Sequence, residues 1–564
     1  MERRQALKIL TGLGIGTVAF QRSVAAMVES GAEINAASIA QAEWVAGIEL
    51  DQEQREQVAE AVVANKAERD FLRQLELGPE VAPAFTFHVA DTQLSAGEIP
   101  SRTARPRHAA TLARPDDDQA LAFCSVVELG GMLRRGEVTS LELTEFALER
   151  LRKYDPLLHC VVTLCEDLAL EQAIRADEEL AAGKDRGPLH GIPWGAKDLI
   201  SVPGYPTTWG APQYQVQQFE TWATVAERLD EAGAVLVAKL SLGALAMGDQ
   251  WFGGMTRCPW DATIGSSGSS AGSASAVAAG LVPFALGSET LGSIVSPSRR
   301  CGVVGFRPTF GRVSRAGCMP LSWTMDKIGP ITRSVEDAAL VFDAIHGADG
   351  IDRAALDRPF QWPSDVPLKG LRVGVIAARR DADPETFDPA AESRIAKLLA
   401  DRGAELVRIE LPREFPVWAL THVLEVESAA MFQGLIDKND TEGLNAWPNI
   451  FRAARFTSAV EYVQLMRVRS LLMDQMAELM RGVDLYISQT DVGYSNLCGY
   501  PSIVIPTGVR QRGDRRPTPT TETLTGQLFE DDRLLGVAAI AQQALGLEEY
   551  WPPLDEQLEG LDTP

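Results

Sequence analysis

The chain has 564 residues, of which 45% are hydrophobic and 23% charged, and this ordinary composition argues against disorder over most of its length. Its formal net charge of -24 argues against nucleic acid or an anionic membrane surface as the main partner, because both bind basic protein faces. The length suits one large α/β domain with additional segments.

The cysteines and histidines give no metal-binding pattern. Seven cysteines are scattered without a CxxC pair, so neither a zinc knuckle nor a disulfide framework is predicted. No two of the six histidines are four residues apart, and the usual helical zinc pair is therefore missing. We expect any hydrolytic chemistry to use no metal, and the shortage of histidine is compatible with a different base.

Residues 1–26 have the pattern of an export signal. Arg3 and Arg4 precede a short apolar run over 9–20, and small residues follow at 23–26. This order is typical of twin-arginine signals, and the apolar run is shorter than the ~20 residues that span a bilayer. We therefore predict a periplasmic or other extracytoplasmic protein. The alternative is an ordinary amphipathic helix on a cytoplasmic protein.

Residues 27–118 are expected to form a helical extension followed by a linker. Apolar residues recur at helical spacing, and a helix capped by Asp51 is predicted to run to about Leu77. From 79 to 118 the chain is rich in Pro, Ala and Arg, which predicts an extended strap on the main domain.

Residues 119–552 are expected to form the catalytic domain, with residues 553–564 as a C-terminal tail. Capping boxes indicate helix starts, and continuous apolar runs indicate buried strands. No internal repeat and no membrane-spanning segment is apparent. Helices are expected after Ser125, from Thr139 to about Tyr154, over 166–182 and over 392–401, and strands over 160–164, 235–239, 371–376, 405–409 and 500–506.

Three short segments could carry chemistry. In the first, over 191–198, Lys197 ends an apolar stretch flanked by Gly and Pro. Burial there would favour the neutral amine, which is a usable base, although a lone lysine of this kind is usually structural. The second, over 264–273, is rich in Ser and Gly and leads into an Ala-rich helix, whose N-terminus favours negative charge.

The second segment has two other interpretations. A flexible linker rarely lies between a strand and a strong helix in mid-domain, and a phosphate-binding loop would need a following Gly-Lys-Ser/Thr. The third segment, over 287–294, places Ser293 after small residues in a tight turn, which resembles a nucleophile beside an oxyanion hole. On its own it could equally be a plain turn.

Together, the three segments resemble the amidase-signature family in their order and spacing. The family core reads roughly Gly-Gly-Ser-Ser-Gly-Gly-Ser, then an Ala-rich helix, then Gly-Ser-Asp-Thr-Gly-Gly-Ser-Ile. The likeness continues over 301–314 and 325–333, with a weaker echo at 496–501. It covers roughly residues 120–550 and leaves about the first 115 outside.

The resemblance implies a Ser–cis-Ser–Lys triad. Ser293 is then the acylated nucleophile, and Ser269 is the bridging serine, held by a cis peptide bond after Gly268. Lys197 is the base that, when neutral, draws the proton through Ser269. The resemblance implies no cofactor and no metal.

The same resemblance supplies the groups around the substrate. The backbone N–H groups of Thr290, Leu291, Gly292 and Ser293 form the oxyanion hole, and such donors are each worth roughly 3 kcal/mol in acyl transfer. The carbonyl of Met247, together with Ser269, is expected to position the substrate.

This chain departs from the family pattern near the nucleophile. Glu289 replaces the usual Asp, and Leu291 replaces a Gly whose small size suits the oxyanion turn. Val295 replaces an Arg, so a charge that supports the loop is expected to be missing. The pair Ser266 and Ser267 is a rival for the bridging serine, although Ser269 fits the spacing better.

The implied fold is a single α/β/α domain, with a large mixed β-sheet covered by helices on both faces. The implied activity is hydrolysis of a small-molecule carboxylic amide through an acyl-serine intermediate. Two alternatives remain: a glutaminase like the A subunit of the amidotransferases, which acts with a partner, and a non-catalytic binding protein on the same fold. A homodimer also remains open.

Residues 415–472 are expected to shape the substrate pocket, because binding residues often lie on variable loops. Their apolar side chains suggest an uncharged aryl or alkyl acyl group, unless they are core residues. These side chains are Trp418, Met431, Phe432, Trp447 and Phe451.

Overall fold

The chain folds around an 11-stranded mixed sheet. The computed structural model describes residues 33–73, 75, 84–85, 104–376, 388–489, 491–511, 516–546 and 551–560. In spatial order the strands are β1 (Val161–Leu164), β3 (Val235–Leu240), β2 (Pro193–Lys197), β8 (Phe284–Glu289), β10 (Lys327–Thr332), β9 (Val304–Arg307), β14 (Ser502–Arg510), β15 (Thr518–Gly526), β13 (Leu485–Ser488), β11 (Arg372–Val375) and β12 (Glu405–Arg408).

The centre of the sheet brings two parallel strand ends together. β2 pairs in parallel with both β3 and β8, whereas β8 pairs with β10 in the antiparallel direction. The carboxyl ends of β2 and β8 therefore meet at one edge of the sheet, which is where open α/β sheets usually bind ligands. Two small hairpins lie outside this sheet: β4 (Gln250–Trp251) with β5 (Gly254–Met255), and β6 (Arg257–Cys258) with β7 (Asp261–Gly265).

Helices cover both faces of the sheet. One face packs against α6 (Val126–Arg135), α9 (Thr224–Glu231), α12 (Val335–Ile345) and α21 (Asp531–Leu545). The other packs against α7 (Ser140–Leu158), α8 (Glu166–Ala181), α10 (Ala271–Ala278) and α11 (Val295–Cys301). This confirms the α/β/α fold. The remaining helices around the sheet are α5 (Asp118–Ala122), α13 (Pro389–Glu392), α14 (Arg394–Ala400), α20 (Val492–Cys498) and α22 (Leu554–Glu559).

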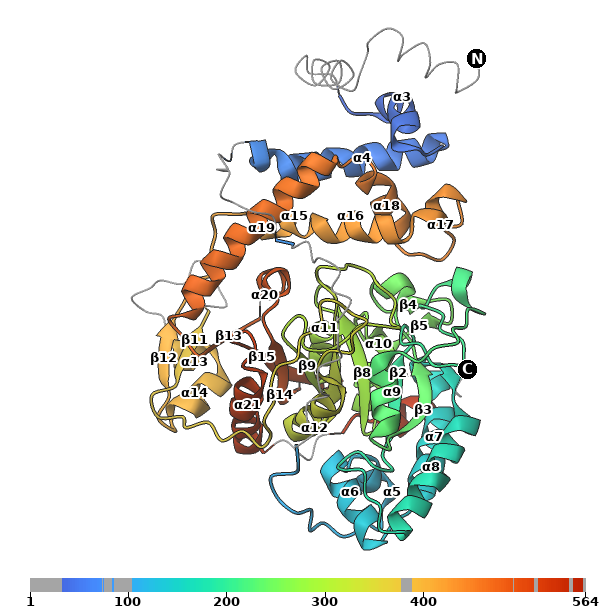
Figure 1. Cartoon of the computed structure of the whole chain (residues 1–564), viewed down its shortest axis with the longest axis vertical. Helices are drawn as coiled ribbons and strands as arrows, with labels where there is room; N and C mark the ends of the chain where they lie inside the picture. The colour runs from blue at the N-terminus through green and yellow to red at the C-terminus, as the bar shows by residue number, and fades with distance from the viewer. Residues whose placement is uncertain are drawn as a thin grey trace.

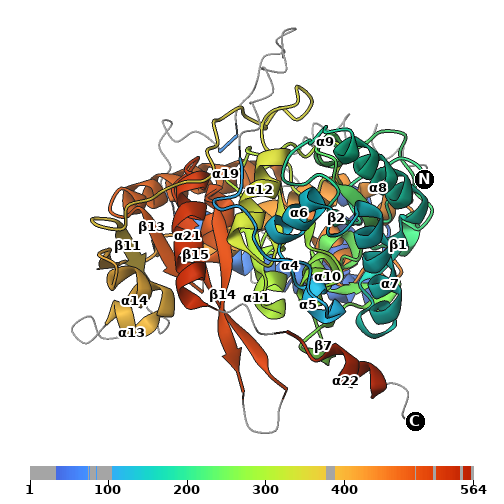
Figure 2. The ribbon, with the colours of Figure 1, turned by 90° about the horizontal axis from the view of Figure 1, so that it is seen from below.

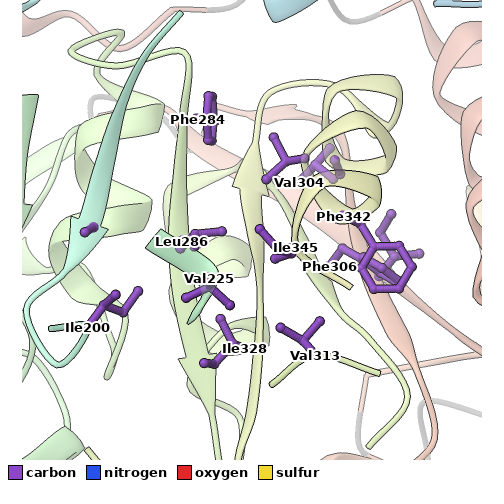
Figure 3. Packing of buried hydrophobic residues seen from close by; sticks show 14 of the residues in the cluster. Ile200, Val225, Phe284, Leu286, Val304, Phe306, Val313, Ile328, Phe342 and Ile345 are labelled. Carbon is purple, nitrogen blue, oxygen red and sulfur yellow. The ribbon is translucent and has the colours of Figure 1, made fainter. Parts of the chain in front are cut away.

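Alternation along the strands divides the core into two clusters. In β8, Phe284 and Leu286 belong to one buried cluster, while Ala285 between them belongs to the other. This follows from the period of two in a strand, which sends successive side chains to opposite faces. Figure 3 shows the first cluster, where Phe284 and Leu286 lie on the same side of the sheet as Val225 and Ile345.

A helical cap lies over the end of the sheet that holds the site (Figure 1). It comprises α15 (Val417–Leu420), α16 (His422–Met431), α17 (Gln433–Asp437), α18 (Trp447–Ala454) and the long α19 (Ala459–Met480). The N-terminal layer, made of α3 (Ala36–Ala46), α4 (Gln52–Arg69) and η1 (Asp70–Arg73), packs on the outer side of this cap. The cap therefore lies between the N-terminal layer and the 11-stranded sheet with its covering helices, which we call the catalytic layer.

Most expected elements are present with shifted ends. Asp51 caps α4 in a capping box, but α4 stops at Arg69 rather than at Leu77. The helix expected to end at about Tyr154 runs to Leu158 as α7. The strand expected over 500–506 begins at Ser502 and continues to Arg510.

The continuation of β14 from Pro506 to Arg510 was not predicted, because a proline usually ends a strand. A proline cannot donate to a strand ladder, so within a sheet it is tolerated at irregular positions. The pairing of β14 with β15 shifts register between Pro506 and Gly508, which accommodates it. β14 and β15 then project as a long hairpin, visible in Figure 2.

The predicted export signal lies outside the described residues. Of the helices that are described, none is long and apolar enough to cross a membrane. Within those same residues, no group of three or more His, Cys, Asp or Glu side chains is arranged to hold a metal ion.

Candidate active site

Lys197 ends β2 and is completely buried beneath the serine-rich loop. Its Nζ donates to Ser269 Oγ at 2.8 Å, to Ser270 Oγ at 3.0 Å and to Ser288 Oγ at 2.9 Å. The Ser288 carbonyl accepts a further bond at 3.3 Å. The amine is therefore surrounded by hydroxyl and carbonyl oxygens.

The pKa of Lys197 follows from this burial. Removing the ammonium from water lowers its pKa to about 7, against the opposing attraction of Asp326 and Glu289. A large fraction of the side chain is thus neutral near neutral pH. A neutral amine at 2.8 Å from Ser269 Oγ can accept a proton from that hydroxyl.

The serine loop places the Ser269 hydroxyl against the Lys197 amine. The Gly268–Ser269 peptide bond is cis, as the resemblance implies. Gly268 packs so closely that an added Cβ would lie 1.9 Å from the Gly248 carbonyl oxygen. One residue after Ser269, the Ser270 N–H donates to the Ser293 carbonyl at 3.0 Å, which joins this loop to the turn that carries Ser293.

Glu289 holds the turn around Ser293. It lies at the end of β8, and its Oε2 accepts bonds from the N–H groups of Ile294 at 2.7 Å and Val295 at 2.9 Å. These are the first two residues after Ser293. One carboxylate therefore fixes the backbone direction immediately after the residue expected to be the nucleophile.

Glu289 is itself held by buried partners. Arg307 Nη1 donates to its Oε1 at 2.6 Å, and Asn496 Nδ2 donates to the same atom at 2.7 Å. Burial would raise the pKa of Glu289, but the charges of Arg307 and Lys327 and the bond from Val295 lower it to about 2. Position 295 carries no charge, and Arg307 supplies a positive charge to this carboxylate from β9.

The turn over 290–293 exposes backbone donors. Gly292 has φ +85°, a left-handed conformation that favours glycine. No acceptor among the described residues receives the N–H groups of Leu291, Gly292 or Ser293. Thr290 is anchored differently, because its Oγ1 donates to Asp326 at 2.6 Å. The turn can therefore present free N–H groups to a developing negative charge.

Leu291, where the family has a glycine, is accommodated by apolar packing. Its half-buried side chain packs against the hydrophobic cluster that includes Met325, Phe415 and Val417, below the cap. The extra bulk is thus accommodated by apolar neighbours. Ser293 remains 9% exposed at the adjoining position.

A small cavity adjoins this turn. Ser288, Thr290 and Asp326 contribute the polar part of its wall. Its remaining wall is mostly apolar and comprises Leu199, Ala246, Cys318, Met319, Leu321 and Ile328, with Arg315 and Lys327.

The carbonyl of Met247, expected to position the substrate, is already engaged. Asn445 Nδ2, between α17 and α18 of the cap, donates to it at 3.2 Å and to the Gln250 carbonyl at 3.2 Å. Trp447 Nε1 donates to the carbonyls of Ala244 and Leu245, both at 3.1 Å. The cap is therefore bonded to the loop that borders Gly268.

The rival serines lie elsewhere in the loop. Ser266 Oγ donates to the Ser267 carbonyl at 2.9 Å, and the Ser267 N–H donates to Asp249 at 2.9 Å. Within the described residues, neither contacts the Lys197 amine. The geometry thus favours Ser269 over this pair.

The aromatic side chains expected in the pocket are mostly core residues of the cap. Trp447 stacks on Phe451 at 4.9 Å between ring centroids, and Phe432 stacks on Phe451 at 5.7 Å. These three are at most 3% exposed, whereas Trp418 is 60% exposed on the outside. They therefore give no information about the acyl group.

Some site residues were missed by sequence reasoning. Ser270 and Ser288 lie in the second and third of the three predicted segments. Their contact with Lys197, however, depends on the packing of β8 against β2. Arg307 and Asn496 are far apart in sequence and meet only at Glu289. The sequence pointed to Arg307 and Asn496 only in that both lie in segments that resemble the family, 301–314 and 496–501.

A buried lysine that bonds to a serine, next to a turn with free backbone donors, is characteristic of enzymes that cleave acyl bonds without a metal. The comparisons with known proteins agree. The amidase family model matches residues 142–493. The A subunit of glutamyl-tRNA(Gln) amidotransferase from Prochlorococcus marinus (strain MIT 9211) is 34% identical over 490 residues, covering 76% of this chain and 99% of that protein.

Solved structures agree as well. The native peptide amidase from Stenotrophomonas maltophilia superposes with a TM-score of 0.67 at 29% identity, covering 76% of this chain and 98% of that one. A bacterial aryl acylamidase of the amidase-signature family has the same fold, with a TM-score of 0.67 at 22% identity, covering 78% and 99%. The chain belongs to the amidase family, and it is an enzyme that hydrolyses carboxylic amide C–N bonds.

Proposed function

We propose that the chain hydrolyses a small-molecule amide with Ser293 as nucleophile, Ser269 as proton relay and Lys197 as base. The observation that carries this proposal is the 2.8 Å contact between the buried amine and Ser269 Oγ. The neutral amine takes the Ser269 proton while Ser269 takes that of Ser293, whose oxygen attacks the amide carbonyl. The backbone N–H groups of residues 290–293 stabilise the oxyanion.

The proton then returns through the same path. Ser269 delivers it to the leaving amine, and water subsequently attacks the acyl-serine ester. The cavity beside Ser288 and Thr290 has room for about one water molecule, so it does not define the acyl group of the substrate.

The test is turnover of a panel of aliphatic and aryl amides by the purified full chain, with ammonia and amine release both measured. A serine-directed phosphonate is expected to label the wild type but not Ser293→Ala. Labelling that persists in Ser293→Ala contradicts the assignment, and no labelling of either chain supports a binding protein on this fold.

A second function has support in the relatives. The similar glutamyl-tRNA(Gln) amidotransferase proteins are named as one subunit of an enzyme, which favours a glutaminase that needs a partner. Amide turnover by the isolated chain separates the two functions, because a partner-dependent glutaminase is expected to be nearly inactive alone.

The proposal includes export of the protein. Residues 1–26 act as a twin-arginine signal, residues 27–118 form an extension, residues 119–552 form the catalytic domain and residues 553–564 form a tail. Fusion of residues 1–26 to a reporter, with a control in which Arg3 and Arg4 are both changed to Lys, tests the signal. A homodimer is tested by light scattering of the purified chain.

A further inference from the structure

Two thiols that hydrolysis does not use lie against one another behind the serine loop. Cys258 ends β6, and Cys301 ends α11; both side chains are buried, at 1% and 0% exposure. The Cys258 thiol donates to the carbonyl of Arg300, the residue before Cys301, at 3.6 Å. The Cys301 thiol is also the neighbour that most affects the pKa of Cys258.

Residues around Cys301 hold the two cysteines in place. Trp260 Nε1 donates to the Cys301 carbonyl at 2.8 Å, so the β6–β7 hairpin is tied to the end of α11. The Cys301 thiol also lies 3.8 Å from the carbonyl of Ser266, in the loop that carries Ser269. The pair therefore joins two catalytic segments: α11 begins two residues after Ser293, and β7 leads into the serine loop.

Cys258 differs from the other cysteines in its protonation. Interaction with the Cys301 thiol lowers the pKa of Cys258, although burial opposes the change, whereas burial raises the pKa of Cys301 well above its usual value. Burial raises the pKa of Cys124 to about 11 and those of Cys165, Cys318 and Cys498 to about 12, and it raises that of Cys160 well above its usual value. The thiolate is the attacking species in disulfide exchange, so Cys258 is the favoured first reactant.

We propose that Cys258 and Cys301 form a disulfide bond by exchange with a disulfide oxidant, such as glutathione disulfide or a disulfide-carrying protein. The Cys258 thiolate attacks one sulfur of the oxidant and releases the other as a thiolate. Cys301 then gives its proton to that thiolate and attacks the Cys258 sulfur, expelling the second thiolate, which takes up from solvent the proton that Cys258 released on ionising. Two protein thiols are oxidised, and one oxidant disulfide is reduced to two thiols.

The C-terminal helix α22 controls access to the pair. Gln557 Nε2 donates to the Pro259 carbonyl at 2.7 Å, and its Oε1 accepts from the Ala262 N–H at 2.8 Å. Leu554 belongs to the same buried cluster as the two cysteines. Figure 2 shows α22 beside β7. We expect an oxidant to reach the thiols when this helix lifts from the hairpin. The predicted export would place the protein in an oxidising compartment.

The test uses the full chain incubated with glutathione disulfide, both folded and during refolding from urea. After acid quenching, denaturation, alkylation and digestion, a Cys258–Cys301 peptide pair that is lighter by two hydrogens is expected. Cys301→Ser is expected to abolish this pair, and Cys165→Ser, a matched buried control, to retain it. Full alkylation of both cysteines in both incubations, or a link to a different cysteine, overturns the proposal.

Two further variants separate the steps. Gln557→Ala loosens the cover, and the folded chain is expected to form the bond several-fold faster; an unchanged rate overturns access by way of α22. Ser293→Ala is expected to form the same bond at the same rate, because the exchange does not use the nucleophile of hydrolysis. A failure of the proposed amidase function therefore remains distinguishable from a failure of this inference.

Discussion

Lys197 and Lys239 occupy neighbouring buried positions in the sheet and differ in their partners. Lys239 forms an ion pair with Asp198 at 2.7 Å, with both side chains fully buried. Lys197 instead contacts the hydroxyl groups of Ser269, Ser270 and Ser288, so no carboxylate at hydrogen-bonding distance stabilises its ammonium form. This difference suits Lys239 to a structural role and Lys197 to accepting a proton.

A pH profile tests this role of Lys197. Its pKa is lowered to about 7 by burial, and the base acts in its neutral form. We therefore expect kcat/KM to fall by about tenfold per pH unit below about pH 7 and to level off above it. Lys197→Met is expected to remove activity, whereas the exposed control Lys369→Met is expected to retain it. A flat profile, or an active Lys197→Met, contradicts the assignment.

The buried pair of Glu289 and Arg307 gives a second residue-scale prediction. Arg307→Met leaves the Glu289 carboxylate buried without its charge partner, which typically costs about 3–5 kcal/mol of folding free energy. We expect turnover to fall as well, because the bonds from Glu289 to Ile294 and Val295 hold the turn after Ser293. Urea unfolding and steady-state kinetics measure the two effects.

The double variant Glu289→Gln with Arg307→Met supplies the control. It removes both charges, so part of the lost stability is expected to return. If Arg307→Met alone unfolds at the same urea concentration as the wild type, the pair does not support the turn.

At the scale of elements, the site depends on close contact between short backbone segments. Gly268 lies against the Gly248 carbonyl, and a Cβ there would approach that oxygen to 1.9 Å, a distance that backbone atoms must move to relieve. We expect Gly268→Ala to displace Ser269 from Lys197 and to reduce kcat by about 100-fold or more, since misplacement by ~1 Å can have an effect of this size.

Gly434 provides the matched control for this prediction. It lies in α17 of the cap, and an added Cβ would meet no heavy atom within 4 Å. Gly434→Ala is therefore expected to keep full activity. Equal activities of the two variants, measured at equal folded fraction by circular dichroism, would show that the close approach at Gly268 is not required.

Local sequence predicted the elements better than it predicted their contacts. Ser125 and Thr139 were identified as helix caps because a capping box depends on residues three apart, and Asp51 was identified as the cap of α4. Lys197 and Ser269 were identified through the resemblance, and the structure brings them together at 2.8 Å.

The support for the turn could not be predicted in the same way. Arg307 reaches Glu289 only because β9 lies beside β10 in the sheet, and Asn496 reaches it from α20. From the sequence, Phe432 and Phe451 could have lined a pocket or filled a core. Pocket-lining and core residues of a helix are both apolar and recur at the same spacing along the sequence. Ring packing with Trp209 and Trp447 decided this, and Trp209 lies far from the two phenylalanines in sequence.

At the scale of the whole molecule, the N-terminal layer and the catalytic layer are linked through the cap. Arg69, in α4, lies 2.7 Å from His422 Nε2 in α16 and 3.8 Å from Glu461 in α19. On the opposite side of the cap, Asn445 and Trp447 bond to the 244–250 loop. A segment outside the amidase match at 142–493 is thereby connected to the wall of the site.

Loosening this link is expected to change the cap before it changes the sheet. Arg69→Met removes a buried hydrogen bond and a nearby opposite charge, worth roughly 1–3 kcal/mol. We expect faster amide hydrogen exchange in α4 and α16, unchanged exchange in β8, and a rise in KM larger than the fall in kcat. Arg55→Met, which breaks a pair with Glu43 inside the N-terminal layer, is expected to leave exchange in α16 unaltered. Identical exchange in α16 for Arg69→Met and the wild type would mean that the cap keeps its position without the N-terminal layer.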